Sequence, residues 1–229
     1  MTKKYEILEH DSVKHNGRTL YRIKALIGFG YVKAGDSGGY IEYECNLSHI
    51  GDCWIDDNAV IYDYARISGD AQVSGYARIF GNARIYDNAR ILGEAVVSGN
   101  AWIFDNAKVS GDAWVHGDAM IFDNAIVYDN ARIFDNAVVS GNAVVSGDAR
   151  VRGDAWVHGN AGIFGDAKVY DNARILGDAQ VDGIAEISGN AWVDDNAIVS
   201  GNAKVSDNAR IFGDAEVSGD AEVSGYTVI

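Results

Sequence analysis

The sequence predicts an all-β protein: a single-stranded parallel β-helix closed at its N-terminal end by a β-hairpin. Three observations support this fold. An alanine recurs at every sixth position from Ala59 to Ala221, and an isoleucine or valine stands two residues after each alanine. The two residues before each alanine are mostly Gly or Asp, followed by Asn or Asp. A fixed period that continues over most of a chain is typical of a repeat protein.

Each six-residue unit predicts a short strand followed by a turn. The alanine and the Ile or Val two residues later lie on the same side of a strand, so both face inward while the residue between them faces outward. β-Branched residues favour strands over helices. Glycine and asparagine are expected to supply the turn, because they adopt positive φ at low cost. Such a pair every six residues would interrupt any helix.

Strands this short and this uniform cannot pair as hairpins with their sequence neighbours. We therefore expect them to stack in parallel on strands one full turn later. Three six-residue sides close a triangular turn of 18 residues, in which the alanines let the walls approach and the Ile and Val side chains fill the interior. The repeat region, residues 51–229, then forms about ten turns spaced about 4.8 Å apart.

Residues 1–50 carry a different pattern, which predicts a cap and a junction. Two strand-like runs flank Asn16-Gly17, a strong signal for a two-residue hairpin turn. Acidic and basic residues nearly balance here, so the net charge of −14 belongs to the repeat region. A solenoid needs a cap over its open apolar end, and this hairpin is well placed to supply one.

The segment that follows the hairpin carries a resemblance to a known family. Residues Val32 to Ala59 read VKAGDSGGYIEYECNLSHIGDCWIDDNA. This stretch resembles the entry segment of the YdcK-type proteins of enteric bacteria, which carry similar VKAG, SGG, NLS and GDCWI sequences. Those proteins are grouped with acetyltransferases by fold, without an established activity. The present chain is shorter and more regular than they are.

The hand of the coil is implied by a second resemblance. An inward aliphatic residue with a small residue four positions later resembles the hexapeptide repeat of left-handed parallel β-helices. The general rule for crossover connections favours the right hand, so the left hand is taken from the resemblance alone. The expected fold is therefore a left-handed parallel β-helix with a hairpin cap.

Composition narrows the classes of function. The net charge of −14 argues against direct nucleic-acid binding. No apolar run approaches the roughly 18 residues of a membrane span, and the N-terminal sequence lacks the apolar region of a secretory signal. Cys45 and Cys53 have no CxxC spacing, so neither a disulfide framework nor a zinc site is indicated. We expect a cytoplasmic protein without a cofactor.

Two histidines in nearly identical stretches, GDAWVHGDA and GDAWVHGNA, raise the question of a catalytic or metal site. His116 and His158 are 42 residues apart, which is two 18-residue turns plus one side. They are therefore expected on different faces, where they cannot share a metal ion. Each should be an exposed corner residue, and His49, just before the first turn, should be structural. We predict no catalytic residue and no metal ligand.

The resemblance to hexapeptide-repeat proteins also implies an alternative function. Hexapeptide-repeat acyltransferases carry a catalytic histidine and a loop that leaves the helix to shape a cofactor cleft between subunits. No such loop is expected between Cys53 and Thr227, because the period is unbroken there. An enzyme of this class stays an alternative, as does an acidic protein that mimics nucleic acid and inhibits a nucleic-acid-binding partner.

We favour a non-catalytic structural or protein-binding β-helix. With an 18-residue turn, one face stacks four consecutive apolar outward residues, and the neighbouring corner adds three aromatic residues. We call these seven residues the interaction face: Trp102, Met120, Val138, Trp156, Tyr86, Phe104 and Phe122. Outward side chains cannot enter the core, so this face should be exposed and available for self-association or a protein partner. Stacking that merely stabilises the sheet is the alternative.

Overall fold

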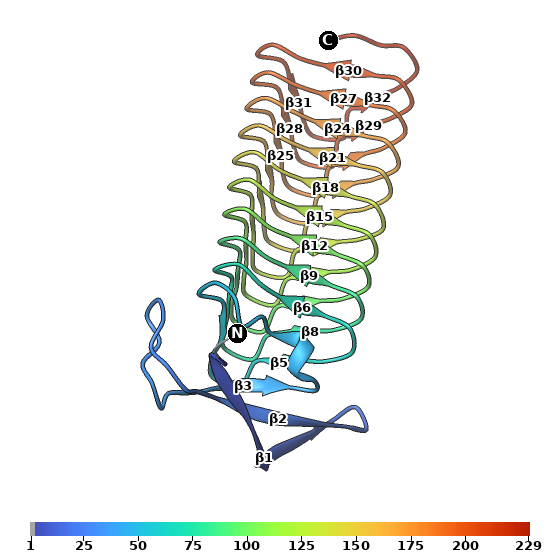
Figure 1. Ribbon diagram of the computed structural model, residues 1–229. Coiled ribbons are helices and arrows are strands. Elements are labelled where there is room, and N and C mark those ends of the chain that lie inside the picture. The colour runs from blue at the N-terminus through green and yellow to red at the C-terminus, as the bar shows by residue number, and fades with distance from the viewer. Residues whose placement is uncertain (1–2) are drawn as a thin grey trace.

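The computed structural model describes residues 3–229, and its repeat region is the coil that the sequence predicts (Figure 1). Every third strand joins the same sheet, and paired residues are one 18-residue turn apart, as Trp102 and Met120 are. The predicted all-β fold, a parallel β-helix with an antiparallel hairpin at its N-terminal end, is confirmed. The period continues without an inserted loop from β4 (Trp54–Ile55) to β32 (Glu222–Val223).

Three sheets form the walls of the β-helix. The 9-stranded sheet contains β6 (Arg66–Ile67), β9 (Arg84–Ile85), β12 (Trp102–Ile103), β15 (Met120–Ile121), β18 (Val138–Val139), β21 (Trp156–Val157), β24 (Arg174–Ile175), β27 (Trp192–Val193) and β30 (Arg210–Ile211). The 10-stranded sheet contains β4, β7 (Gln72–Val73), β10 (Arg90–Ile91), β13 (Lys108–Val109), β16 (Ile126–Val127), β19 (Val144–Val145), β22 (Gly162–Ile163), β25 (Gln180–Val181), β28 (Ile198–Val199) and β31 (Glu216–Val217).

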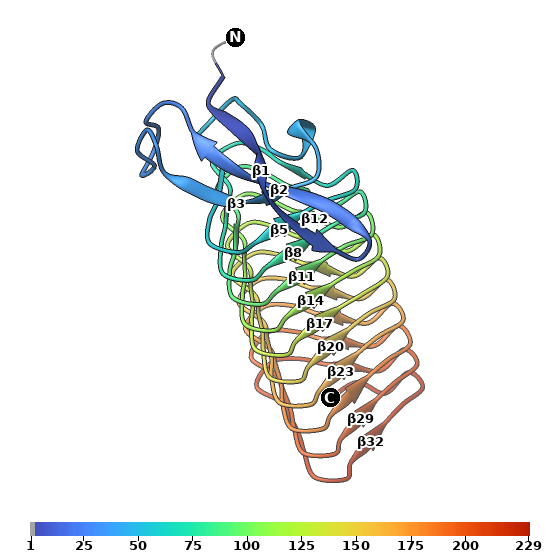
Figure 2. The ribbon, with the colours of Figure 1, turned by 90° about the horizontal axis from the view of Figure 1, so that it is seen from below.

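The 13-stranded sheet includes the cap. Its strands, in order across the sheet, are β1 (Tyr5–His15), β2 (Arg18–Ala25), β3 (Ser37–Ile41), β5 (Val60–Ile61), β8 (Arg78–Ile79), β11 (Val96–Val97), β14 (Trp114–Val115), β17 (Arg132–Ile133), β20 (Arg150–Val151), β23 (Lys168–Val169), β26 (Glu186–Ile187), β29 (Lys204–Val205) and β32. Figure 2 shows β1, β2 and β3 continuing this wall beyond β5. The hairpin is thus an extension of one wall.

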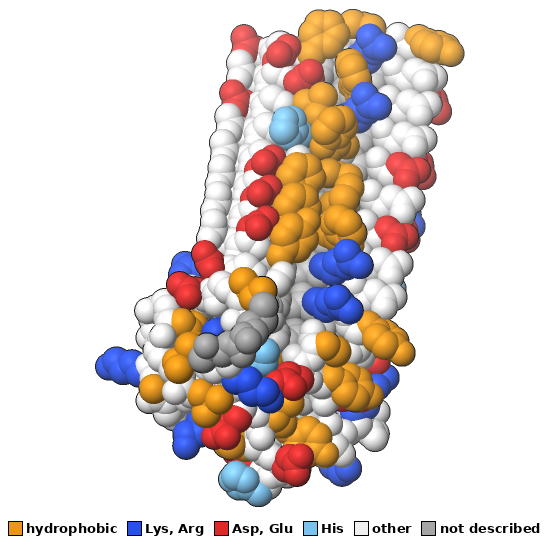
Figure 3. Space-filling model, in the orientation of Figure 1, with side chains coloured by type: hydrophobic (Ala, Val, Ile, Leu, Met, Phe, Trp, Pro, Cys, Tyr) orange, Lys and Arg blue, Asp and Glu red, His pale blue; other side chains and the backbone are white. Residues whose placement is uncertain are grey.

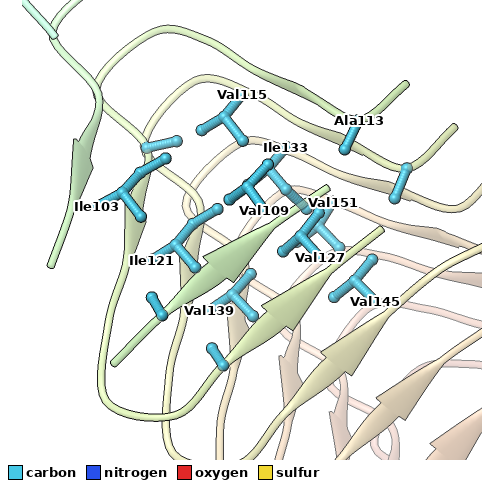
Figure 4. Close-up of a cluster of buried hydrophobic side chains, with 14 of the residues drawn as sticks. Ile103, Val109, Ala113, Val115, Ile121, Val127, Ile133, Val139, Val145 and Val151 are labelled. Carbon is cyan, nitrogen blue, oxygen red and sulfur yellow. The ribbon is translucent and has the colours of Figure 1, made fainter. Parts of the chain in front are cut away.

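The core is a single column of small and β-branched side chains. From Ala59 to Ala209 every repeat alanine is fully buried, and so are the Ile and Val residues that follow them in the same strands, apart from Ile67 at 1% exposure. Figure 4 shows how Ile103, Val109 and Val115 point to a common axis from three different strands, with Ile121 and Val127 one turn further on. This packing explains the strict choice of residues, because a larger side chain at the alanine position would push the walls apart.

The hairpin closes the N-terminal end of this core. Asn16 and Gly17 both have positive φ, as a two-residue turn of this kind requires. Tyr5 and Ile23 are fully buried and join the core cluster together with Trp54 of the first turn. The short 3-10 helix η1 (Glu44–Asn46) precedes the first turn and is the only helical segment in residues 3–229, and it is far too short to cross a membrane.

Candidate functional site

The outward residues of β12, β15, β18 and β21 form the flat part of the interaction face. Trp102 and Trp156 have exposed fractions of 38% and 39%, which is large for indole side chains on a sheet surface. Met120 and Val138 lie between them and are half-buried. The register pairs each of these residues with the next, so the four side chains form one continuous row along the sheet.

A second row runs along the adjacent corner. The rings of Tyr86 and Phe104 stack with centroids 4.9 Å apart and planes 1° apart, and Phe104 and Phe122 stack at 5.0 Å and 7°. Tyr86 also meets Trp102 edge-on at 6.3 Å, which joins the two rows. In Figure 3 they appear as a band of hydrophobic side chains along the middle of the β-helix. The seven predicted residues are therefore contiguous.

Arginines bound the flat row at both ends. The guanidinium of Arg84 lies 5.2 Å from the Trp102 ring centroid. At the other end, Arg174 lies between Trp156 at 5.9 Å and Trp192 at 5.4 Å. A cation over an indole ring is attracted by the ring's negative face. These contacts hold the exposed Trp side chains in fixed positions on the sheet.

Three aspartates flank the corner row. Asp87, Asp105 and Asp123 follow directly after Tyr86, Phe104 and Phe122 in the sequence. The carboxylate of Asp105 accepts a hydrogen bond from the Asp123 backbone N–H at 3.2 Å. Burial raises the pKa of the Tyr86 hydroxyl, with a smaller contribution from the charges of Asp87 and Asp105. The face thus has an acidic border along one half of its length.

The structure places His116 and His158 on different corners, as the spacing predicts. Both are exposed, and each has a nitrogen, Nδ1, within hydrogen-bonding distance of a serine one turn earlier: Ser98 at 2.9 Å and Ser140 at 3.0 Å. His158 also contacts Trp156, with ring centroids 5.7 Å apart. His158 therefore lies at the edge of the interaction face, which the sequence interpretation did not include.

His49 has structural contacts in the cap. Its ring stacks on Tyr5 with centroids 4.3 Å apart. Its Nδ1 accepts a hydrogen bond from the backbone N–H of Lys4 at 3.2 Å, and its Nε2 lies 3.0 Å from the Glu44 carboxylate. These contacts fix the hairpin to the first turn. Within residues 3–229, no three His, Cys, Asp or Glu side chains are grouped so as to hold a metal ion.

One hollow that the sequence did not indicate lies beside the tip of the hairpin. Its volume is about 330 Å³, and it is lined by His15, Asn58, Val60, Tyr76, Arg78 and Glu94. Burial lowers the pKa of His15, and the charge of Arg78 lowers it further. His15 reaches this position because the hairpin tip folds over the outer surface of the sheet, where His15 contacts Tyr62. No repeat pattern could indicate that contact.

Comparison with known proteins agrees with the repeat type. The family model described as YdcK Beta solenoid repeat matches residues 77–93, 83–99, 131–147 and 145–159. These segments are therefore similar to YdcK-type repeats, which agrees with the family resemblance seen in the sequence, although none of them includes residues 32–59, where that resemblance was found. No curated protein matches the chain. Among solved structures, LpxA from Acinetobacter baumannii is similar at 13% identity and a TM-score of 0.34, over 67% of this chain and 66% of that chain.

Proposed function

We propose that this chain, whose repeats resemble the YdcK β-solenoid type, is a non-catalytic structural or protein-binding β-helix that self-associates through the interaction face. The observation that carries this proposal is the contiguity of two apolar rows on a protein with a net charge of −14. Contiguous apolar patches of this kind on soluble proteins mark interaction sites. Trp and Met are also enriched at the centres of protein interfaces, with Arg.

Removing the two exposed indoles from water supplies a useful driving force. A Trp side chain of roughly 250 Å² that is about 40% exposed still presents about 100 Å² to solvent. At about 25 cal/mol per Å², covering that area contributes roughly 2.5 kcal/mol for each Trp. Two Trp side chains on each of two chains therefore contribute about 10 kcal/mol, which offsets much of the roughly 4–15 kcal/mol that association costs in lost translational and rotational freedom.

Aromatic stacking within the chain accounts for the corner row, whereas the arginine contacts in the flat row still leave its two Trp side chains 38% and 39% exposed. Tyr86, Phe104 and Phe122 stack on one another and would stabilise the corner in a monomer. Trp102 and Trp156 are three turns apart, and Met120 and Val138 lie between them in the row. They cannot stack on each other, so their exposed surface fits an intermolecular role.

The test is a pair of charge substitutions on the exposed indoles. Trp102→Glu combined with Trp156→Glu should convert a self-associated protein to a monomer in sedimentation velocity experiments, because each copy would bring charges into an apolar contact. The circular dichroism spectrum should be unchanged, since neither side chain belongs to the core. The matched control is Trp114→Glu on the 13-stranded sheet, where the indole is 42% exposed, and this variant should still associate.

Two results together would contradict the proposal. One is a native protein that sediments as a monomer at all accessible concentrations. The other is a double variant whose only change is a lower melting temperature. The interaction face would then be a stabilising feature of the sheet surface.

A further inference from the structure

The order of residue types along the flat row of the interaction face is almost the same in both directions. Along consecutive turns of the 9-stranded sheet the outward residues are Arg84, Trp102, Met120, Val138, Trp156 and Arg174. The centre of this sequence lies between Met120 and Val138, two half-buried apolar residues. Outward from the centre, each direction meets a tryptophan and then an arginine. Figure 3 shows the corresponding band of hydrophobic side chains with basic side chains beyond both of its ends.

A row with this symmetry is suited to an interface between two identical chains. A two-fold axis makes each residue of one copy face the residue of the other copy that is equally far from the centre. If the axis crosses the face between Met120 and Val138, the two helices run antiparallel. Trp102 of each copy then lies on Trp156 of the other, and Met120 lies on Val138. Aromatic pairs at both ends of the contact add to the apolar area that is buried.

The acidic corner is arranged so that the same axis brings no two acids together. Its residues on six consecutive turns are Asp87, Asp105, Asp123, Gly141, Gly159 and Gly177. Reversal of direction therefore places each aspartate of one copy opposite a glycine of the other. It also brings His158 of one copy beside Asp105 of the other. A glycine leaves room for the opposing carboxylate, and an imidazole N–H beside it can donate a hydrogen bond to that carboxylate.

The opposite corner follows the same rule with amides in place of glycines. Its six residues are Asn82, Asn100, Asp118, Asn136, Asp154 and Asn172, of which several are joined by hydrogen bonds between turns. About the same centre, Asn100 faces Asp154 and Asp118 faces Asn136. Every acid of one copy thus faces an amide of the other, and an amide N–H can donate to a carboxylate.

A parallel arrangement breaks the pattern at the corners. The arginines do not distinguish the two arrangements, because Arg84 faces Arg174 in the antiparallel dimer and Arg84 in the parallel one. A two-fold axis along the helix would, however, lay one corner on the other. Asp123 of one copy would then face Asp118 of its partner. Like charges directly opposite each other in an interface are unfavourable, so the charge pattern selects the antiparallel arrangement.

From these observations we infer that the occupant of the interaction face is a second copy of this chain, docked antiparallel with Trp102 on Trp156. This inference rests on the proposed function and adds the identity and orientation of the partner. The available area is close to what a dimer needs: a side about 20 Å wide and eight paired turns long, from Arg66 to Trp192, covers about 770 Å². A standard interface buries about 800 Å² on each partner.

Site-directed cross-linking tests the orientation. Arg84→Cys and Arg174→Cys are made separately in a Cys45→Ser background, because Cys45 is exposed while Cys53 is buried. One variant carries a size tag, and the two are mixed and treated with a bismaleimide that spans about 10 Å, the usual separation of packed sheets. In the antiparallel dimer the two cysteines face each other, so the mixture should yield the cross-linked heterodimer. Each variant alone should yield none, because its two cysteines lie five turns, about 24 Å, apart.

The outcomes separate this inference from the proposed function. A cross-linked homodimer from Arg84→Cys alone would establish a parallel dimer, which overturns the antiparallel orientation and leaves self-association intact. If the protein sediments as a dimer but no cross-link forms, the second copy does not dock on the interaction face, and the inference is overturned. A monomer under all conditions overturns both proposals. Lys168→Cys, on the 13-stranded sheet, is the matched control and should not cross-link with either variant.

Discussion

At the scale of the residue, the turns explain why the repeat alternates between Gly and Asp at one position. Ten aspartates occupy this position with φ between 55° and 59°, and the remaining turns use glycine with positive φ. In residues 3–229, Asn16 is the only asparagine with positive φ. The expectation that repeat asparagines supply the left-handed residue was therefore wrong. The next position carries the asparagines, whose side chains form ladders such as Asn88 to Asn106 to Asn124.

The aspartate with positive φ and the asparagine that follows it make different hydrogen bonds, because their side chains differ. An aspartate in the left-handed position accepts a hydrogen bond from the backbone N–H of the residue one turn later, as Asp57 does from Gly75 at 2.9 Å. An amide can both donate and accept, so only an asparagine continues a ladder in both directions. The sequence pattern shows both residue types at the corner, but it cannot say which one has positive φ, since both tolerate it.

A substitution in a glycine turn tests this assignment. Gly201 has a φ of 69° and precedes Asn202, so Gly201→Asp recreates the Asp-Asn pair of other turns. Gly201→Ala should lower the free energy of unfolding by at least about 1–2 kcal/mol, because an ordinary residue adopts left-handed backbone at that cost and its Cβ would also lie 2.9 Å from the backbone nitrogen of Gly219. Gly201→Asp should cost less, because its carboxylate can accept the N–H of Gly219. Urea denaturation of both variants measures the difference, and an aspartate variant no more stable than the alanine variant contradicts the assignment.

The histidines give a second residue-scale prediction. Replacing both His116 and His158 by Ala should change the free energy of unfolding by less than about 1 kcal/mol, because both are exposed and each makes one hydrogen bond to a serine. Urea denaturation measures the stability, and elemental analysis of the purified protein measures its metal content before and after the substitutions. Loss of a bound metal in the double variant would show that the histidines form a site.

At the scale of the element, the cap shows where a sequence pattern stops being informative. The two hairpin strands and the Asn16-Gly17 turn were predicted and are present as β1 and β2. Strand β3 was not predicted, because its SGGYI sequence has two glycines and no alternation. The reason for those glycines is tertiary. A Cβ at Gly38 would lie 2.5 Å from the carbonyl oxygen of Ile55, and one at Gly39 would lie 2.6 Å from that of Ala59.

The cap should be needed for solubility. Deleting residues 1–45 removes Tyr5 and Phe29, whose rings pack against Trp54 with centroids 6.4 and 5.5 Å away. It also leaves β5 without its neighbour β3. An open strand edge and an exposed apolar core favour aggregation. We expect the truncated protein to elute as large aggregates in size-exclusion chromatography. A truncated monomer with unchanged melting temperature would show that the first turn closes its own end.

At the scale of the whole molecule, the period alone determined most of the architecture. Once the turn is 18 residues long, each outward residue is assigned to one of three sheets, and the contiguity of Trp102 with Met120 follows by counting. Two features could not be obtained in this way. The hand of the coil was taken from a family resemblance, since the repeat unit can form its backbone hydrogen bonds in a left-handed or a right-handed coil. The hollow beside His15 depends on how the hairpin folds back, which is a tertiary contact.

Because of the six-residue period, a deletion can move the residues of the interaction face to other sheets while the core pattern is kept. Deleting residues 129–140 removes two six-residue units and keeps the phase of the core, because Tyr128 is then followed by Gly141 and Asn142. Every later outward residue moves to the neighbouring sheet, so Trp156 leaves the face that holds Trp102. Deleting residues 123–140 removes a whole turn, and Phe122 is then followed by Gly141. Trp102, Met120 and Trp156 stay on one sheet, with Met120 at the new centre of the row.

These two deletions should therefore have opposite effects on association and on stability. The 12-residue deletion loses less of the core and should unfold at a higher urea concentration than the 18-residue deletion, because the stability of a solenoid is roughly a sum over its repeats. We nevertheless expect the 12-residue deletion to sediment as a monomer and the less stable 18-residue deletion to self-associate. If association instead follows stability, or if both deletions associate equally, the alignment of Trp102 with Trp156 on one sheet is not what holds two copies together.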